Sequence, residues 1–488
     1  MKSQITDLEP KLIWGFFNDL TNIPRPSKSE GKAISFIYDF GKRLGYETIK
    51  DNVGNVIIKK PASKGMERKK VTVLQAHLDM VPQKNTQKEH DFEKDPIKAY
   101  IDGEWVTADG TTLGADNGIG VAAIMAVLES KDVEHGPIEA LFTIDEETGL
   151  TGASELKPDI LKGEVLLNLD SENDEELFIG CAGGINANIT FDFKTDKVPK
   201  GYIPYKVSVK NLKGGHSGLD INKGRGNSII ILIRILWRAT FKCDIKLCNV
   251  NGGNLRNAIP REAFAEILVP EEKCDEFSRF INGYEGILKV EYSIIEPDIT
   301  IKAEQTGSPD YIIDEETHKK FISAIYTCPN GVIRMSSDIE NLVETSSNLA
   351  IVMTKAKQIH VQCLLRSSME SAKDDLVGRF QSLFELAGAK VNFEGEYPGW
   401  KPNMESGILK ISKDVYQKKF GVLPEIKAIH AGLECGIIGG TYPAMDMISF
   451  GPTIKDAHSP DEKVNITSVS KFWNYLIEIL KNIPDRDN

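Results

Sequence analysis

The first third of the chain alternates between strand and helix patterns, and this alternation constrains the fold more than any other feature. Residues 71–76, 138–143 and 165–169 are short runs with the pattern of strands, and residues 71–76 are apolar enough for a central strand. Residues 118–128, between the first two runs, have the continuous apolar pattern of a buried helix. Strands separated by helices usually lie parallel in one sheet, because each helix carries the chain back to the same end. The sequence therefore predicts an α/β domain with a mostly parallel sheet.

This alternation is interrupted in the middle of the chain and returns near its end. A chain of 488 residues exceeds what one compact core usually holds, so two domains are expected. We predict that residues 1–185 and 398–488 form the α/β domain and that residues 186–397 form an inserted α+β domain. In the inserted domain, helices are expected at residues 227–239 and 371–387 and from Asp314, and strands at residues 202–209, 263–269, 288–295, 349–354 and 360–365.

The charge of the chain and its apolar runs exclude several classes of protein. A net charge of −12 argues against nucleic acid and anionic membranes as the main partner. The most apolar segment, residues 229–237, is interrupted by Arg234 and is shorter than a membrane span. The N-terminal segment carries Asp7 and Glu9 and lacks the basic and then apolar layout of a signal peptide. The seven cysteines contain no Cys-x-x-Cys pair, so a cytoplasmic protein without a disulfide framework is the simplest interpretation.

Polar residues follow the predicted strands at the points where the strands end. The carboxyl ends of parallel strands meet at one edge of a sheet, where the active sites of α/β domains gather. Each group alone has an ordinary interpretation as a hydrogen-bonded pair, a solvated turn or a helix cap. Five groups at one edge are different, because crowded carboxylates repel one another and a bound cation relieves the repulsion. The residues concerned are His77 and Asp79, Asp116, the pair Glu146 and Glu147, Asp170, and His458.

This ordered set resembles the co-catalytic zinc exopeptidases, a family that includes carboxypeptidase G, acetylornithine deacetylase, peptidase T and the carnosinases. The resemblance covers nearly the whole chain, the inserted domain included. It implies an α/β catalytic domain with two metal ions and an inserted lid domain that contacts the substrate. In the family's arrangement, Asp116 bridges both ions, His77 and Asp170 complete one site, and Glu147 and His458 complete the other. Asp79 holds the imidazole of His77, and Glu146 is the general base.

The chemistry of these residue types agrees with the implied roles. Imidazole and carboxylate ligands suit Zn²⁺ and also accept Mn²⁺ or Co²⁺. Three ligand carboxylates against two divalent ions leave a residual positive charge, which acidifies a bridging water and polarises the scissile carbonyl. Glu146 takes the proton of that water and hands it to the departing amine. Because Glu146 and Glu147 are adjacent, their side chains point in different directions, so one binds metal while the other faces the water.

Three residues of the inserted domain match family positions that bind substrate. His216, in residues 214–218 (GGHSG), resembles the family's oxyanion-stabilising histidine, whereas a histidine between glycines is otherwise a plain turn residue. Asn257 resembles the asparagine that contacts the substrate backbone. Arg366 resembles the arginine that binds the C-terminal carboxylate, a task for which its planar fork is suited. The alternative for Arg366 is a surface charge on an edge strand.

Residues 430–436 (HAGLECG) resemble the signature of the aminoacyl-histidine dipeptidases, the bacterial carnosinase-type branch of the family. Peptidase T has an Arg-Gly-Gly-Thr-Asp-Gly type of sequence in this region, which the chain lacks. Gly432 and Glu434 are expected to contact the substrate or its loop. We therefore predict a metal-dependent dipeptidase for small peptides, including Xaa-His, and the resemblance is compatible with a homodimer. The alternatives are a tripeptidase, an N-acyl-amino-acid amidohydrolase of the same family, or a non-catalytic peptide-binding relative.

Overall fold

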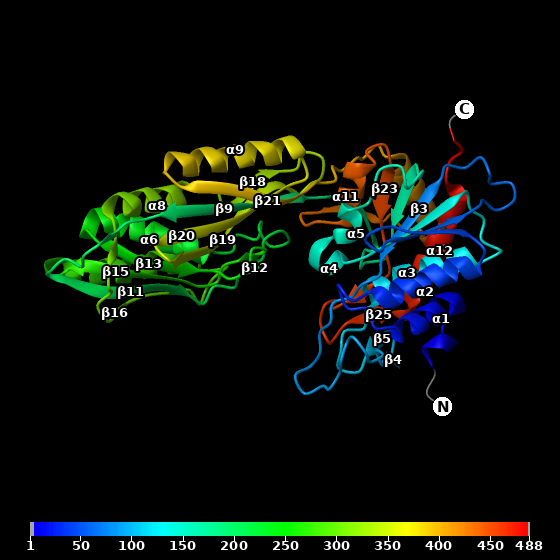
Figure 1. The fold of residues 1–488 in the computed structure, drawn as a ribbon, viewed down its shortest axis with the longest axis horizontal. Coiled ribbons are helices and arrows are strands. Elements are labelled where there is room, and N and C mark those ends of the chain that lie inside the picture. The colour runs from blue at the N-terminus through cyan, green and yellow to red at the C-terminus, as the bar shows by residue number, and fades with distance from the viewer. Residues whose placement is uncertain (1–3, 487–488) are drawn as a thin grey trace. The chain divides into compact units, whose positions relative to one another are not determined.

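The computed structural model describes residues 4–486, which form two compact units (Figure 1). The first unit comprises the described residues up to Gly180, the segment Pro402–Ala428 and the described residues from Leu433 onward. The second unit comprises Cys181–Lys401 and the short segment Ile429–Gly432. Residues 1–3 and 487–488, which the predicted domain ranges include, lie outside the described residues.

The observed division differs in detail from the predicted ranges. The chain enters the second unit at Cys181, a few residues earlier than predicted, and leaves it a few residues later. The segment Ile429–Gly432 also belongs to the second unit, although the prediction placed it in the α/β domain. Backbone hydrogen bonds explain its position, because the Ala182 N–H lies 3.0 Å from the carbonyl oxygen of Ile429 and 3.1 Å from that of Ala431.

An eight-stranded sheet forms the centre of the first unit. Its central strands are parallel and almost completely buried: β6 (Ile138–Thr143), β3 (Thr72–His77), β7 (Val165–Asn168) and β23 (Asp446–Ser449). Continuous apolar runs suit these positions, because both faces of a central parallel strand are covered. The outer strands are β1 (Glu47–Lys50), β2 (Val56–Lys60), β8 (Glu176–Cys181) and β22 (Glu425–Ile429). The order is β1-β2-β6-β3-β7-β23-β8-β22, and β1, β2 and β8 pair antiparallel with their neighbours. The α/β class is confirmed, as a mixed sheet with a parallel centre.

The helix α3 (Ala115–Glu129) packs against β3 and is buried along nearly its whole length, which explains its unbroken apolar pattern. The other described helices of this unit are η1 (Ile5–Asp7), α1 (Lys11–Thr21), α2 (Gly31–Arg43), α4 (Glu146–Gly149), α5 (Thr151–Ser154), α10 (Gly407–Phe420), α11 (Glu434–Thr441) and α12 (Ile466–Asn482). A small sheet contains β4 (Ala99–Asp102), β5 (Trp105–Ala108), β24 (Ile454–Lys455) and β25 (Lys463–Asn465). Among residues 4–486, no helix is both long enough and apolar enough to cross a membrane.

The second unit is an antiparallel sheet covered by helices over one hydrophobic core. Its main strands are β9 (Gly183–Asp192), β11 (Tyr202–Lys210), β13 (Lys246–Gly252), β15 (Ala263–Pro270), β16 (Thr300–Gln305), β18 (Gly331–Met335), β19 (Val343–Lys355), β20 (Gln358–Ser367) and β21 (Lys390–Tyr397). Its helices are α6 (Ser228–Cys243), η2 (Glu271–Lys273), α7 (Cys274–Glu291), α8 (Glu315–Thr327) and α9 (Glu370–Leu386). Two short ladders join β10 (Thr195–Asp196) to β17 (Ile312–Ile313) and β12 (Gly215–His216) to β14 (Ala258–Ile259).

The strand order of this sheet, β16-β11-β15-β13-β19-β20-β9-β21, contains a structural repeat. One half follows the chain as β11, α6, β13, β15, α7 and β16. The other half follows it in the same pattern as β9, α8, β19, β20, α9 and β21, with the first half inserted after β9. The two halves meet where β13 pairs with β19.

One predicted strand of the second unit is wrong. Residues 288–295 belong to the end of α7 and to the turn that follows it. The buried residues of α7 recur at helical spacing and end at Leu288. Beyond it, Val290 and Ile294 face solvent with 78% and 89% exposure, whereas Tyr292 and Ile295 are half-buried, so the segment lacks the buried face of a strand.

Candidate active site

His77 is the last residue of β3, and its buried imidazole faces carboxylates on both sides. Its Nε2 atom lies 3.1 Å from Oδ1 of Asp116 and 3.2 Å from Oδ1 of Asp170. Asp116 lies in the first turn of α3, and Asp170 follows β7, the neighbour of β3 in the sheet. The fold thus brings Asp116 of α3 together with His77 and Asp170, which stand at the carboxyl ends of adjacent parallel strands.

The second oxygen of Asp116 faces a second group of side chains. His458 Nε2 lies 3.1 Å from Oδ2 of Asp116 and 3.0 Å from Oε2 of Glu147. One carboxylate therefore serves two clusters and directs one oxygen to each, which is the geometry of a bridging ligand. All five residues that the sequence analysis expected to bind metal are brought together in the first unit.

Asp79 is fully buried on the other side of the His77 ring. Its Oδ1 atom lies 3.4 Å from Nδ1 of His77 and accepts the N–H of Glu146 at 3.0 Å, and its Oδ2 accepts the N–H of Glu147 at 3.2 Å. Burial raises the pKa of this carboxyl, but the interactions with His77, the Glu146 N–H and the Ser27 hydroxyl outweigh burial and lower the pKa to about 2. Asp79 is hence an anion that orients both the imidazole and the turn that carries the two glutamates.

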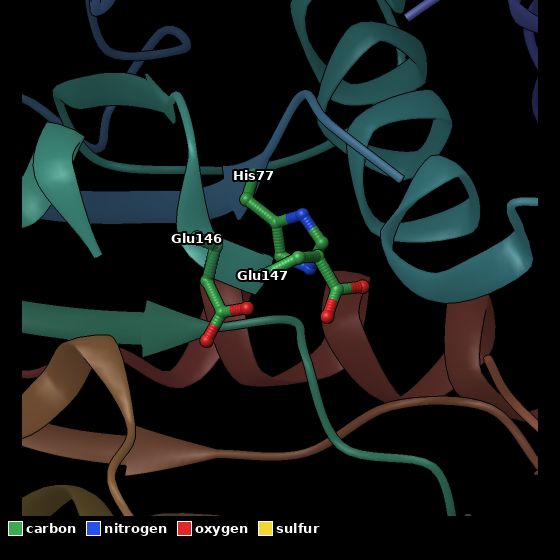
Figure 2. Close-up of side chains that lie close together, drawn as sticks. All are labelled: His77, Glu146 and Glu147. Atoms are coloured by element: carbon green, nitrogen blue, oxygen red, sulfur yellow. The ribbon is translucent and has the colours of Figure 1, made fainter. Parts of the chain in front are cut away.

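Glu146 and Glu147 open the short helix α4, just beyond the end of β6. Figure 2 shows their carboxylates directed apart with the His77 imidazole beside them, and one ligand atom from each of the three residues lies within 4.8 Å of the others. Burial raises the pKa of Glu146 well above its usual range; His77 opposes this shift, and the nearby carboxylate of Asp170 adds to it. A carboxylate with a raised pKa can accept and release a proton near neutral pH, as a general base must.

The two clusters fit a pair of divalent cations. Each cluster offers one imidazole nitrogen and two carboxylates, with Asp116 counted in both, and its ligand atoms lie within 4.8 Å of one another. Hydrogen bonds to Asp116 and Glu147 raise the pKa of His458 to about 11, so a proton here compensates for the carboxylates. In the part of the chain that the structure describes, the buried Oε1 atom of Glu147 has no hydrogen-bond partner. A cation would take over the charge compensation and would coordinate this oxygen.

In the second unit, His216 lies in β12 with its ring half-buried. Its Nδ1 atom accepts the N–H groups of Gly218 at 3.2 Å and Leu219 at 3.1 Å, so the proton of the neutral ring is on Nε2. Burial lowers the pKa of His216, and the positive charge of Arg366 lowers it further. The fold therefore presents a neutral imidazole whose Nε2–H is a fixed donor, which suits an oxyanion.

Asn257 and Arg366 occupy different settings in the second unit. The carbonyl of Asn257 accepts the N–H of Ser217 at 2.8 Å, which ties this exposed residue to the loop of His216. Arg366 lies in β20 between β19 and β9 and is only 5% exposed, which excludes a surface charge on an edge strand. Its Nη1 donates to the Tyr397 hydroxyl at 2.8 Å, and its buried Nε has no hydrogen-bond partner within residues 4–486.

Gly432 and Glu434 fall on opposite sides of a unit boundary, with Gly432 in the second unit and Glu434 in the first. The expected substrate contact of Glu434 does not fit the structure. Its side chain is completely buried and accepts hydrogen bonds from Gln75 Nε2 and Thr143 Oγ1. Burial raises its pKa to about 8, so Glu434 is a neutral acid at neutral pH.

Three further polar residues surround the ligands and were not identified from the sequence. Asn117 donates through Nδ2 to the Asp170 carboxylate, while Arg25 and Glu462 bind the backbone just before Asp116. Asn117 could have been found from its place beside Asp116, and Glu462 from its place four residues after His458. Arg25 lies far from every recognised motif and has no such signal.

Comparison with known proteins assigns the chain and its fold to a class. Residues 73–482 match the family model described as peptidase family M20/M25/M40, and the chain belongs to this family. It is 45% identical over 482 residues to the cytosol non-specific dipeptidase of Escherichia coli (strain K12), a match that covers 99% of each chain. The crystal structure of aminoacylhistidine dipeptidase from Vibrio alginolyticus matches with a TM-score of 0.94 and 49% identity over 99% of each chain.

A more distant structure shares the fold alone. The aminopeptidase PepT from Bacillus cereus matches with a TM-score of 0.57 and 16% identity, and the match covers 98% of this chain and 99% of the other. Together, the family match and the two similar dipeptidases confirm the resemblance, the fold class and the type of enzyme that the sequence predicted, a dipeptidase.

Proposed function

We propose that the protein is a two-metal dipeptidase that acts on free dipeptides, among them Xaa-His. The observation that carries the proposal is the geometry of Asp116, whose two oxygens each lie 3.1 Å from the imidazole of a different cluster. His77 and Asp170 would complete one metal site, and Glu147 and His458 the other. The donor set suits Zn²⁺, with Mn²⁺ or Co²⁺ as alternatives. The substrate range follows the names of the two similar proteins, a non-specific dipeptidase and an aminoacylhistidine dipeptidase.

Glu146 is the general base of the proposed mechanism. When bound, the two ions supply the positive charge that acidifies a water molecule and polarises the scissile carbonyl. Glu146 accepts the proton of the attacking water and passes it to the leaving amine, and its raised pKa suits both steps. Asp79 holds the Glu146 backbone through a 3.0 Å hydrogen bond, so the base cannot drift when its charge changes.

Residues of the second unit supply the groups that recognise the peptide. The Nε2–H of His216 is the proposed donor to the oxygen that becomes negative during hydrolysis. Arg366 is the proposed partner of the C-terminal carboxylate, because its buried Nε has no hydrogen-bond partner among the described residues. Asn257 and Gly432 are proposed to contact the peptide backbone. Glu434 is not among these residues, since its side chain is enclosed.

We also propose a cytoplasmic location and small peptides as the binding partners. The similar protein of Escherichia coli is named a cytosol dipeptidase, which supports the location. The net charge of −12 disfavours nucleic acid and anionic membrane surfaces as partners.

The test uses protein reconstituted with Zn²⁺, Mn²⁺ or Co²⁺ and three sets of substrates: dipeptides including Xaa-His, tripeptides, and N-acyl amino acids. We expect release of free amino acids from dipeptides, loss of this activity on chelation, and recovery when Zn²⁺ is added back. Full activity of the chelated protein would contradict the metal roles. Faster turnover of tripeptides or N-acyl amino acids would replace the dipeptidase with one of these alternatives.

A further inference from the structure

Two buried charged side chains, Arg25 and Glu462, contact the loop that leads into α3 and carries Asp116. Each of them is 2% exposed. Charged side chains are seldom buried to this degree without a specific partner. Here the partners are backbone groups of the Asp116 loop. Arg25, near the start of the chain, and Glu462, near its end, both contact this loop.

Glu462 accepts four successive backbone N–H groups. Its Oε2 atom lies 2.7 Å from the N atom of Leu113 and 3.0 Å from that of Gly114, and its Oε1 lies 2.7 Å from the N atom of Ala115 and 3.3 Å from that of Asp116. Gly114 has a positive φ of 71°, which turns neighbouring N–H groups toward one point and favours glycine there. Both oxygens of the Glu462 carboxylate therefore accept hydrogen bonds from one stretch of backbone and hold it in place.

Arg25 holds the same stretch through its carbonyl groups and joins it to the end of β3. Its Nη2 donates to the carbonyl of Gly114 at 2.5 Å, and its Nη1 donates at 3.0 Å to the carbonyls of both Leu78 and Asp79. A Cβ atom on Gly114 or Gly118 would lie 2.7 or 2.6 Å from Nη2, so both glycines make room for the guanidinium. Its planar fork thus ties the segment after His77 to the loop of Asp116.

We propose that Arg25 and Glu462 are positioning residues that hold the Asp116 carboxylate midway between His77 and His458; this rests on the proposed two-metal function. The two oxygens of Asp116 each lie 3.1 Å from one imidazole, so a small rotation or shift would move the carboxylate away from one cluster or both. Repulsion from the neighbouring carboxylates favours such a shift. The opposite charges of Arg25 and Glu462 hold the loop without adding net charge to the site.

The test measures metal binding directly on Glu462→Gln, Glu462→Asp and Arg25→Lys. The matched control is Glu139→Gln, because Glu139 is also a buried carboxylate (4% exposed) that accepts backbone N–H groups, from Lys162 at 2.7 Å and Gly163 at 3.0 Å. It lies at the start of β6, at the opposite end of the strand from the ligands. Zn²⁺ affinity is measured by competition with a chromophoric chelator, and the ligand geometry by the visible spectrum of the Co²⁺-loaded protein.

We expect the Glu462 and Arg25 variants to bind both Zn²⁺ ions about 10–100-fold more weakly and to shift the Co²⁺ absorption bands. Glu139→Gln should keep the parent's affinity and spectrum even if it lowers the melting temperature. Parental affinity and spectra in the folded Glu462 and Arg25 variants would overturn the proposal and leave these residues with a structural role alone. If Glu462→Gln does not fold, Glu462→Asp and Arg25→Lys decide by the same criterion. A parent protein that binds no pair of ions would instead refute the proposed function.

Discussion

Replacing Glu434 with glutamine should stabilise the protein at neutral pH. Burial raises the pKa of this carboxyl from 4.5 to about 8, so the folded state keeps a proton that the unfolded chain releases. Its contribution to stability is therefore fully present below pH 4.5 and is lost as the pH rises toward 8. Each pH unit in this window costs about 1.4 kcal/mol. Glutamine keeps the size and remains neutral, so Glu434→Gln should gain roughly 3 kcal/mol over the parent at pH 7.

The assay is urea unfolding of parent and variant in the presence of a chelator, at intervals from pH 5 to pH 9. The difference in the free energy of unfolding should grow with pH up to about 8 and then level off. Bound Zn²⁺ favours the ionised form of a nearby carboxyl, so the difference should shrink in the metal-loaded protein. A pH-independent difference would refute the reasoning, because Glu434 would then have the same charge in the folded and unfolded states.

Three further predictions concern catalysis. Glu146→Gln should lower turnover roughly a hundredfold or more while metal stays bound, whereas Glu147→Gln should weaken metal binding. Measurements of metal content and kcat on both variants test this, and the reverse result would exchange the two roles. His216→Ala should raise the barrier by about 2–4 kcal/mol without loss of metal, and parental kcat would make His216 a turn residue. Arg366→Ala should lower kcat/KM for free dipeptides by a factor that corresponds to several kcal/mol of activation free energy, and for amidated dipeptides by much less. An unchanged preference between these substrates would contradict its role.

The centre of the first unit could be predicted because its pattern is unambiguous. Residues 138–143, which are mostly apolar, coincide with β6, since a central parallel strand is buried on both faces. The strand ends then marked the ligands, because His77 terminates β3 and Asp170 follows β7. Strand ends of a parallel sheet are close in space whatever their separation in the sequence, so a linear pattern indicated a three-dimensional site.

Other features could not be predicted, for two physical reasons. Residues 288–295 contain both a helical and an alternating pattern, and short apolar segments do not distinguish the two. Arg25 and Glu462 were missed, and the burial of Glu434 was not foreseen, because charged residues are usually exposed and sequence does not show which of them will be buried. Most partners of Arg25 and Glu462 are backbone groups that are distant in the sequence. The Leu113 N–H, for example, is 349 residues away from Glu462 along the chain. Backbone partners leave no trace in residue type.

The buried charges around Asp116 explain how a cluster of carboxylates can keep its geometry before a cation arrives. Side chains of like charge repel most strongly where water is excluded, so ligands on free loops would move apart. Glu462 accepts N–H groups and Arg25 donates to a carbonyl of the backbone that leads to Asp116, and Asp79 accepts the N–H groups of Glu146 and Glu147. In each case the anchor binds peptide groups, whose geometry does not change when a ligand gains or loses a proton. Cation binding then relieves repulsion in a site that is already formed. Because the loops are already ordered, the whole binding free energy of the cations adds to the stability of the folded state.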